Sequence, residues 1–201
     1  MSESPEVSTV IHELAGILSS LQGFAEIVES RPDHPEREKM ISLVRKEARR
    51  AAQALKDLQT HRAMDADRLV ETLQPVVLRE ALADSPVAGL VPDDMPAVRA
   101  DPKLIADVIP RCIELAAQDA LSEIVVTQGA IEIKIPMGSE ADAEELRKDV
   151  ATGRATMRPL ALARRLFERW GGGARVEESD SQTFVVLVLV NFDAPGNPAP
   201  S

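Results

Sequence analysis

Aromatic side chains are scarce in this sequence of 201 residues. They make up 2% of it, with one Trp, four Phe and no Tyr, so stacking platforms for bases or sugars are hard to build. Cysteine occurs once, at Cys112, which excludes an intrachain disulfide and a cysteine-rich zinc site. A lone thiol fits a reducing compartment, and we expect a cytoplasmic protein.

Long apolar runs and basic charge are also lacking. No run reaches the roughly 20 residues that a membrane helix needs. The first residues lack the basic and then apolar pattern of a signal peptide, so we expect neither a signal peptide nor a membrane partner. The net charge is −10, which repels phosphate backbones, and we expect no nucleic-acid partner.

Residues 6–68 show the periodicity of two helices joined by a proline-containing loop. Apolar residues alternate at spacings of four and three, as in helices that pack together: Val7, Ile11, Leu14, Leu18, Leu21, Ala25 and Val28, then Ile41, Val44, Ala48, Ala51, Leu55 and Leu58. Further apolar residues lie off these stripes, at Val10, Ile17, Phe24, Ile27, Leu43 and Ala52. One hairpin cannot bury them all, which predicts a homodimer with a four-helix bundle. The alternative is that the second domain covers them.

Residues 75–192 predict an α/β sandwich domain with a mixed sheet and helices on one face, which makes the whole chain α+β. The expected strands are 86–91, 97–99, 123–128, 130–135, 174–178 and 183–190, and the expected helices are 104–116, 141–150 and 159–170. Asp101 precedes a proline and should cap the first of these helices. The run 184–190 is apolar on both faces, which indicates a central strand. Residues 193–201 should be a disordered tail.

The first helix contains the segment HELAGILSSLQGFAE, residues 12–26. It resembles the H box of the dimerization and phosphoacceptor domain of bacterial histidine kinases, at the place on the hairpin where that family has it. The resemblance implies that His12 accepts a phosphoryl group and that Glu13 orients its ring. The chemistry agrees, because a neutral imidazole is a nucleophile near pH 7 and a carboxylate can hold or take its proton. Without the surrounding match, a solvated His-Glu pair would be the simpler interpretation.

The segment departs from the family at two positions. The family usually has proline where this chain has Ile17, and often Thr or Asn, which supports phosphatase activity, where it has Gly16. This puts phosphatase activity in doubt. His34 and His61 lie outside the motif, and we predict that both are solvated surface residues.

The second domain resembles the ATP-binding domain of the same kinases, through residues 100–104 and 160–173 and the closing apolar strand, so the resemblance spans about residues 6–191. The family's nucleotide-binding residues are nevertheless absent. Arg111 and Leu115 replace its two asparagines, Met137 falls in the region of its adenine-reading box, and Pro159 falls in its glycine-rich hinge. Phosphate needs the close backbone approach that glycine permits. We therefore predict a degenerate domain that binds no ATP, with the Gly171–Gly173 run as a helix end.

A phosphoacceptor helix without a working kinase domain is similar to the histidine phosphotransferases of phosphorelays. The resemblance implies that His12 relays a phosphoryl group between aspartates of receiver domains, and that the receiver, not this chain, supplies the magnesium. The expected partner surface is the helix flank around His12, with part of the second helix, at Ala15, Gly16, Ser19, Ser20 and Gln22. The alternative is a non-catalytic pseudokinase scaffold that binds a kinase or a response regulator.

Overall fold

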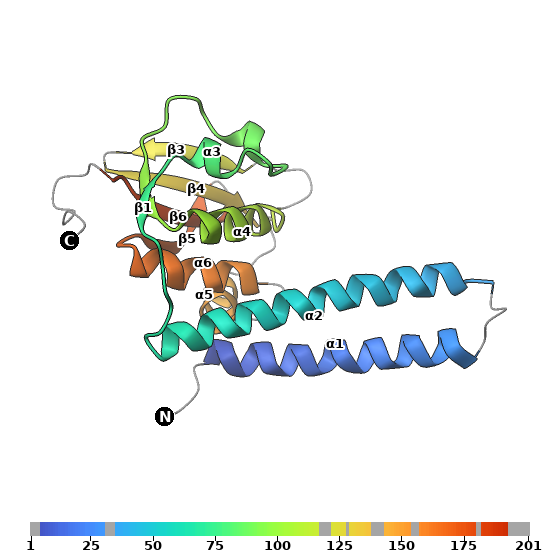
Figure 1. Cartoon of the computed structure of the whole chain (residues 1–201). Helices are drawn as coiled ribbons and strands as arrows, with labels where there is room; N and C mark the ends of the chain where they lie inside the picture. The colour runs from blue at the N-terminus through green and yellow to red at the C-terminus, as the bar shows by residue number, and fades with distance from the viewer. Residues whose placement is uncertain are drawn as a thin grey trace. The chain divides into compact units, whose positions relative to one another are not determined.

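The computed structural model describes residues 5–30, 35–116, 122–127, 129–137, 143–153, 157–179 and 182–192. The chain divides into two compact units, Met1–Leu69 and Val70–Ser201, which are described separately (Figure 1). The predicted tail at 193–201 lies outside the described residues, and so does His34. The α+β class is confirmed, because two long helices precede a unit of strands and shorter helices.

The first unit is a hairpin of α1 (Pro5–Ser30) and α2 (Arg37–Asp65), which lie side by side along most of their length (Figure 1). Its core is apolar and comes from both helices: Val7, Val10, Ile17, Ala54 and Leu58, with Leu14, Leu21 and Ala51 packed against them. The inward row of α1 therefore has spacings of three, four, three and four from Val7 to Leu21, as a helical seam requires.

This row differs from the stripe that the sequence predicted. Val10 and Ile17, which were expected off the stripe, are buried, whereas Leu18 is 53% exposed and Ile11 is also exposed. On α2, Leu55 is 46% exposed although it belonged to the predicted stripe. The hairpin thus leaves apolar side chains of both helices uncovered.

His61 is fully buried, so its prediction as a surface residue is wrong. It comes three residues after Leu58 and seven after Ala54, both of which are in the hairpin core. Residues at these spacings share one face of a helix, so His61 continues the inward row of α2. Nearness to the end of α2 therefore does not expose His61.

The second unit contains a four-stranded sheet in the order β3-β4-β6-β5. The strands are β3 (Glu123–Thr127), β4 (Ala130–Pro136), β5 (Gly173–Ser179) and β6 (Gln182–Val190). The predicted central position of the last strand is confirmed, because β6 pairs with both β4 and β5. The predicted mixed sheet is wrong, since every described pairing is antiparallel.

Three helices pack together on one side of this sheet (Figure 1). They are α4 (Pro102–Ile113), α5 (Ala143–Thr152) and α6 (Arg158–Arg169). The helix α6 ends as expected at Gly171, whose φ of 87° places it in the left-handed region that favours glycine. The sheet and the helices form the two-layer sandwich that the sequence predicted.

The segment before α4 differs most from its prediction. The expected strand at 86–91 is instead a 3₁₀ turn, η1 (Ala88–Leu90), between Pro86 and Pro92. A short strand, β1 (Gln74–Val76), and a one-turn helix, α3 (Leu78–Ala81), were not predicted. The expected strand at 97–99 is confirmed as β2 (Val98–Ala100), which pairs with β1.

Asp101 caps α4 as predicted. Its Oδ1 accepts hydrogen bonds from the backbone N–H groups of Lys103 at 2.9 Å and Leu104 at 3.1 Å. Its Oδ2 accepts a third bond, from the N–H of Thr72 at 2.8 Å. The carboxylate is buried and joins the start of α4 to the segment that precedes β1.

Replacing Asp101 by alanine should lower the free energy of unfolding by about 2 kcal/mol or more, because a helix cap and a buried acceptor are lost together. Thermal unfolding of the full chain, followed by circular dichroism, measures the change. Asp94→Ala is the matched control, since the Asp94 side chain is exposed. Equal melting temperatures for the two variants would show that the cap does not stabilise the unit.

Candidate functional site

His12 lies on α1 with its side chain exposed. It precedes Leu14, which packs against the hairpin core, by two residues. Because each residue turns a helix by about 100°, His12 points nearly away from α2. The imidazole is therefore open to a partner molecule, as the sequence predicted.

Glu13 is covered by α2 and has a charged partner there. Its side chain is 8% exposed, and its Oε1 accepts a hydrogen bond from Nη2 of Arg50 at 3.3 Å. The Nη1 atom of Arg50 lies 3.3 Å from Oε2 of Glu47, so one guanidinium joins carboxylates of both helices. The role of Glu13 in orienting His12 stays a prediction.

Sequence reasoning missed Arg50, because periodicity alone does not align the two helices with each other. A signal was present, however. Glu13 directly precedes the inward Leu14 and Arg50 directly precedes the inward Ala51, so each residue flanks the seam of its own helix. Opposite charges at flanking positions of paired helices form interhelical ion pairs.

The five residues expected to contact a partner are all exposed: Ala15, Gly16, Ser19, Ser20 and Gln22. A Cβ atom added at Gly16 would have no other atom within 4 Å, and the same is true of Gly23. Packing therefore does not require glycine at either place. The side chains beside His12 at Ala15, Gly16 and Ser19 are small and uncharged. The Ser20 hydroxyl donates a hydrogen bond to the backbone carbonyl of Gly16, one helical turn earlier, at 3.0 Å.

The hairpin has two unlike flanks. Helical periodicity puts the exposed Ile11, Leu18 and Leu55 on one of them. The Glu13–Arg50 ion pair lies on the opposite flank. One flank is thus apolar and the other is charged, and His12 projects between them on the outer side of α1.

The second unit contains Arg111 and Pro159, which the sequence resemblance places at nucleotide-binding positions of the kinases. Arg111 folds back along α4, where its Nε donates to the carbonyl of Asp107 at 3.2 Å and its Nη2 lies 3.5 Å from Oδ2 of the same residue. By the sequence resemblance Arg111 replaces the asparagine that holds magnesium in the kinases, and a guanidinium group offers no acceptor to a metal ion. Arg158 is buried at the start of α6 and Pro159 follows it.

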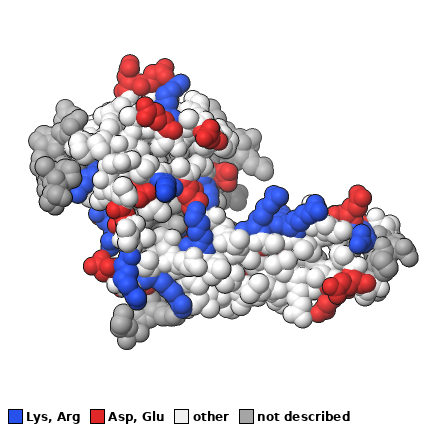
Figure 2. Space-filling model, in the orientation of Figure 1, with Lys and Arg blue, Asp and Glu red and all other residues white. Residues whose placement is uncertain are grey.

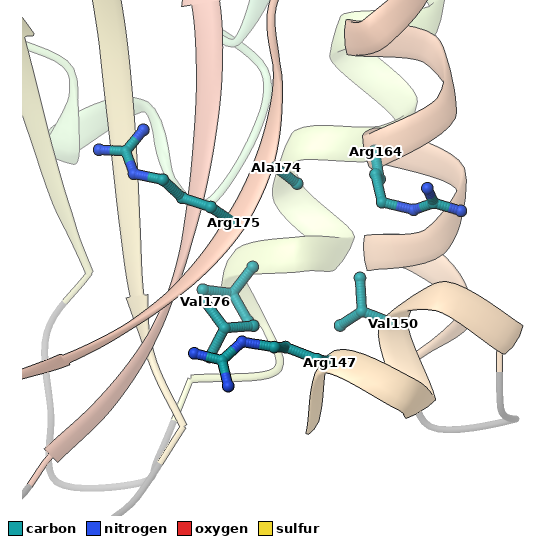
Figure 3. A pocket seen from close by; sticks show the side chains of 7 residues that line it. Arg147, Val150, Arg164, Ala174, Arg175 and Val176 are labelled. Atoms are coloured by element: carbon teal, nitrogen blue, oxygen red, sulfur yellow. The ribbon is translucent and has the colours of Figure 1, made fainter. Parts of the chain in front are cut away.

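A hollow of about 290 Å³ opens elsewhere in the second unit (Figure 3). Its lining is Arg147, Val150, Arg164, Ala174, Arg175, Val176 and Val185. Figure 3 shows the Arg164 and Arg175 guanidinium groups pointing in opposite directions. Each arginine already contacts a glutamate, and the hydrogen bonds of Arg175 to Glu132 and then to Glu177 raise its pKa above the ordinary value. The arginines therefore do not converge on a common anion.

The described residues contain neither a cluster of metal-binding side chains nor a membrane-spanning helix. Within the described ranges, no three His, Cys, Asp or Glu side chains are grouped so that they could hold a metal ion. Among the helices that the structure describes, none combines the length and the apolar character needed to cross a bilayer.

The hairpin followed by the helix-and-sheet sandwich is the fold of a histidine kinase core. The Acinetobacter baumannii histidine kinase AdeS superposes with a TM-score of 0.66 at 15% identity, over 90% of this chain and 98% of AdeS. Full-length ShkA in complex with AMPPNP superposes with a TM-score of 0.53 at 19% identity, over 96% of this chain and 47% of ShkA. The chain thus spans about half of ShkA. No protein-family model matches the chain, and no curated protein matches it in sequence.

Proposed function

We propose that the protein is a histidine phosphotransferase of a two-component phosphorelay, and that His12 carries the phosphoryl group. The observation that supports this most strongly is an exposed histidine, inside an H-box motif, on the first helix of a hairpin with the histidine kinase fold. Aspartyl phosphates of receiver domains are the substrates, and magnesium comes with the receiver.

In the proposed step, a neutral ring nitrogen of His12 attacks the phosphorus of the aspartyl phosphate. The P–N bond forms as the P–O bond to the aspartyl carboxyl group breaks, and the aspartate leaves as a carboxylate. The proton on the other ring nitrogen is then held or taken by Glu13. A second receiver aspartate reverses these steps and returns His12 to the neutral imidazole.

Glu13 has to exchange Arg50 for the imidazole before it can act on His12. The Arg50 side chain is 48% exposed, so water can solvate its guanidinium group when the pair opens, whereas the Glu13 side chain is 8% exposed and has to turn toward His12 at the same time. Arg50 would hold the carboxylate in place until phosphotransfer requires it.

The second unit supports phosphotransfer without autophosphorylation. Arg111 would repel the magnesium of a bound ATP, and Met157 and Pro159 stand in place of the glycines that let a backbone approach phosphate. In this proposal the unit has kept the kinase fold and lost the kinase reaction.

Titration of the protein with ATP and magnesium should therefore give no binding heat up to about millimolar nucleotide, which corresponds to less than about 4 kcal/mol of binding free energy. Isothermal calorimetry of the full chain measures this, with an active histidine kinase in the same buffer as the control. A dissociation constant in the tens of micromolar would contradict the proposal and favour an ATP-dependent kinase.

We also propose that the protein is a homodimer through the apolar flank of the hairpin. Ile11, Leu18 and Leu55 have too much exposed apolar surface for one flank of a lone hairpin, and two copies would cover it in a four-helix bundle. The charged flank with Glu13 and Arg50 stays outside such a seam, so dimerization would leave His12 accessible.

Phosphotransfer is tested with labelled receiver domains. Receivers of the same organism are phosphorylated with labelled acetyl phosphate, freed of it and mixed with the protein. The protein should gain a label that is stable in alkali and lost in acid, as a phosphoramidate is, and should pass it to a second receiver. Labelled ATP alone should not label it. Absence of transfer from every receiver would favour the scaffold alternative.

A further inference from the structure

Charge is distributed very unevenly between the two helices of the hairpin. The helix α1 contains four glutamates and no Lys or Arg, whereas α2 contains eight Lys and Arg against four Asp and Glu. The whole chain has a net charge of −10. A basic helix is unexpected in such an acidic protein.

The basic residues gather in the middle of α2. Arg45, Lys46, Arg49 and Arg50 fall within six residues and form what we call the basic patch. All four are exposed, and Figure 2 shows blue side chains collected over this part of the hairpin. Arg50 pairs with Glu13 and Glu47, but among the described residues no carboxylate forms an ion pair with the other three.

The patch does not serve the stability of α2. Arg45 and Arg49 are four residues apart, and so are Lys46 and Arg50, and like charges at this spacing destabilise a helix by a few tenths of a kcal/mol per pair. Repulsion of this kind is relieved when an acidic surface binds. The repulsion between these like charges therefore favours a role for the patch in binding an acidic partner.

The patch reaches the charged flank of the hairpin beside Glu13, the neighbour of His12. It spans about 8 Å of helix, at about 1.5 Å per residue. Its last member, Arg50, touches Glu13, the neighbour of His12. Electrostatic attraction acts over about one Debye length, roughly 8 Å at physiological salt, so Lys46 and Arg50 on this flank act most strongly on a receiver that covers it, while Arg45 and Arg49 lie on the outer side of α2. Arg50 and Lys46 also lie on the flank away from Ile11, Leu18 and Leu55, which keeps them clear of the proposed dimer seam.

We propose that the basic patch is the electrostatic docking surface for the acidic, phosphoaspartate-bearing face of the receiver domain, an inference that rests on the proposed phosphotransfer at His12. The uncharged residues Ala15, Gly16 and Ser19 let the partner approach α1 closely, while α2 supplies the attraction. Nucleic acid is the other polyanion that a basic patch could attract. The net charge of −10 disfavours it, because the long phosphate backbone extends over acidic surface as well.

The test uses Lys46→Gln/Arg49→Gln, which leaves Arg50 and its contact with Glu13 intact. The second-order rate constant of transfer from a labelled receiver should fall by about 10-fold at 50 mM salt, since removal of charge mainly slows association. The rate at saturating receiver should stay unchanged. In 0.5 M salt the wild type and the variant should converge. Lys46→Glu/Arg49→Glu should slow association further.

The matched control is Arg37→Gln/Lys39→Gln, which removes the same charge from the same helix roughly 16–20 Å from Arg50. This variant should keep the wild-type rate constant within about twofold, because screening removes the attraction at that distance. Equal losses in the two double variants would overturn the docking surface, and so would a transfer rate that does not depend on salt.

A binding measurement separates this proposal from the phosphotransfer proposal. Fluorescence anisotropy of a labelled receiver against His12→Ala protein should still show weakening by salt and by Lys46→Gln/Arg49→Gln. If the wild type accepts label but Lys46→Gln/Arg49→Gln does not weaken receiver binding, the docking surface is wrong and the phosphotransfer proposal stands. Absence of His12-dependent label in the wild type overturns both. Patch-dependent binding of a 20-base-pair DNA duplex, with none of a receiver, overturns the docking proposal in favour of nucleic acid.

Discussion

Replacing His12 by alanine should abolish transfer of label from a phosphorylated receiver to this protein. The imidazole is the proposed nucleophile, and alanine offers no nitrogen to form the P–N bond. The variant should keep its circular dichroism spectrum and its oligomeric state, because the His12 side chain is exposed and outside the hairpin core. Autoradiography of the separated proteins measures the label.

Variants of the neighbouring ion pair separate orientation from nucleophilicity. Glu13→Ala should slow transfer by about 10- to 1000-fold, the effect of losing a positioned proton-transfer group. Arg50→Ala frees the Glu13 carboxylate and should change the rate less than Glu13→Ala does. If His12→Ala protein supports signalling in cells at the wild-type level, phosphotransfer through His12 is wrong and the scaffold alternative replaces it.

The second large effect is expected at the dimer seam. The double variant Leu18→Glu/Leu55→Glu should be monomeric, because each carboxylate left unpaired in a buried seam costs roughly 3–5 kcal/mol. The dimer dissociation constant should rise by at least about 1000-fold, and sedimentation equilibrium measures it. The hairpin itself should stay helical, since both side chains are about half exposed within a single chain.

The matched control for this variant adds the same charge elsewhere on the hairpin. Ser20→Glu/Ser42→Glu places two glutamates on exposed polar positions away from the apolar flank, and this protein should stay dimeric. A wild-type protein that sediments as a monomer at micromolar concentration would contradict the proposed dimer directly.

The helical hairpin could be predicted because its apolar spacing and its proline-containing turn agree. Which face of α1 packs on α2 could not be predicted from spacing. Val7, Leu14 and Leu21 belong to two overlapping rows, one completed by Val10 and Ile17 and the other by Ile11 and Leu18. Both rows fit a helical seam, and only the register and tilt of the second helix decide between them.

Elements that depend on their neighbours were the least predictable. Strand β1 has three residues, Gln74–Val76, of which only Val76 is buried, so its pairing with β2 leaves almost no trace in local hydropathy. The 3₁₀ turn at Ala88–Leu90 lies in an apolar stretch that resembles a short strand. In contrast, the cap at Asp101 involves residues next to one another in sequence, and it was predicted correctly.

In the candidate site, too, the local features could be predicted and the contacts between distant residues could not. His12 and its exposed neighbours follow from a local motif and from the position of that motif on α1. The contact between Glu13 and Arg50 joins residues 37 positions apart, so it depends on the alignment of two helices. Charge on each helix could be counted from the sequence, but the meeting of Glu13 and Arg50 on one flank required the structure.

The open space around Gly16 and Gly23 has a consequence for motion. Each glycine costs a helix roughly 1 kcal/mol relative to alanine, and no packing contact offsets that cost within the described chain. The stretch of α1 just after His12 should therefore open more often than the facing stretch of α2, and its amide hydrogens should exchange with solvent faster. A helix that yields there can bend toward an incoming surface while the core around Val7 and Val10 keeps the hairpin closed.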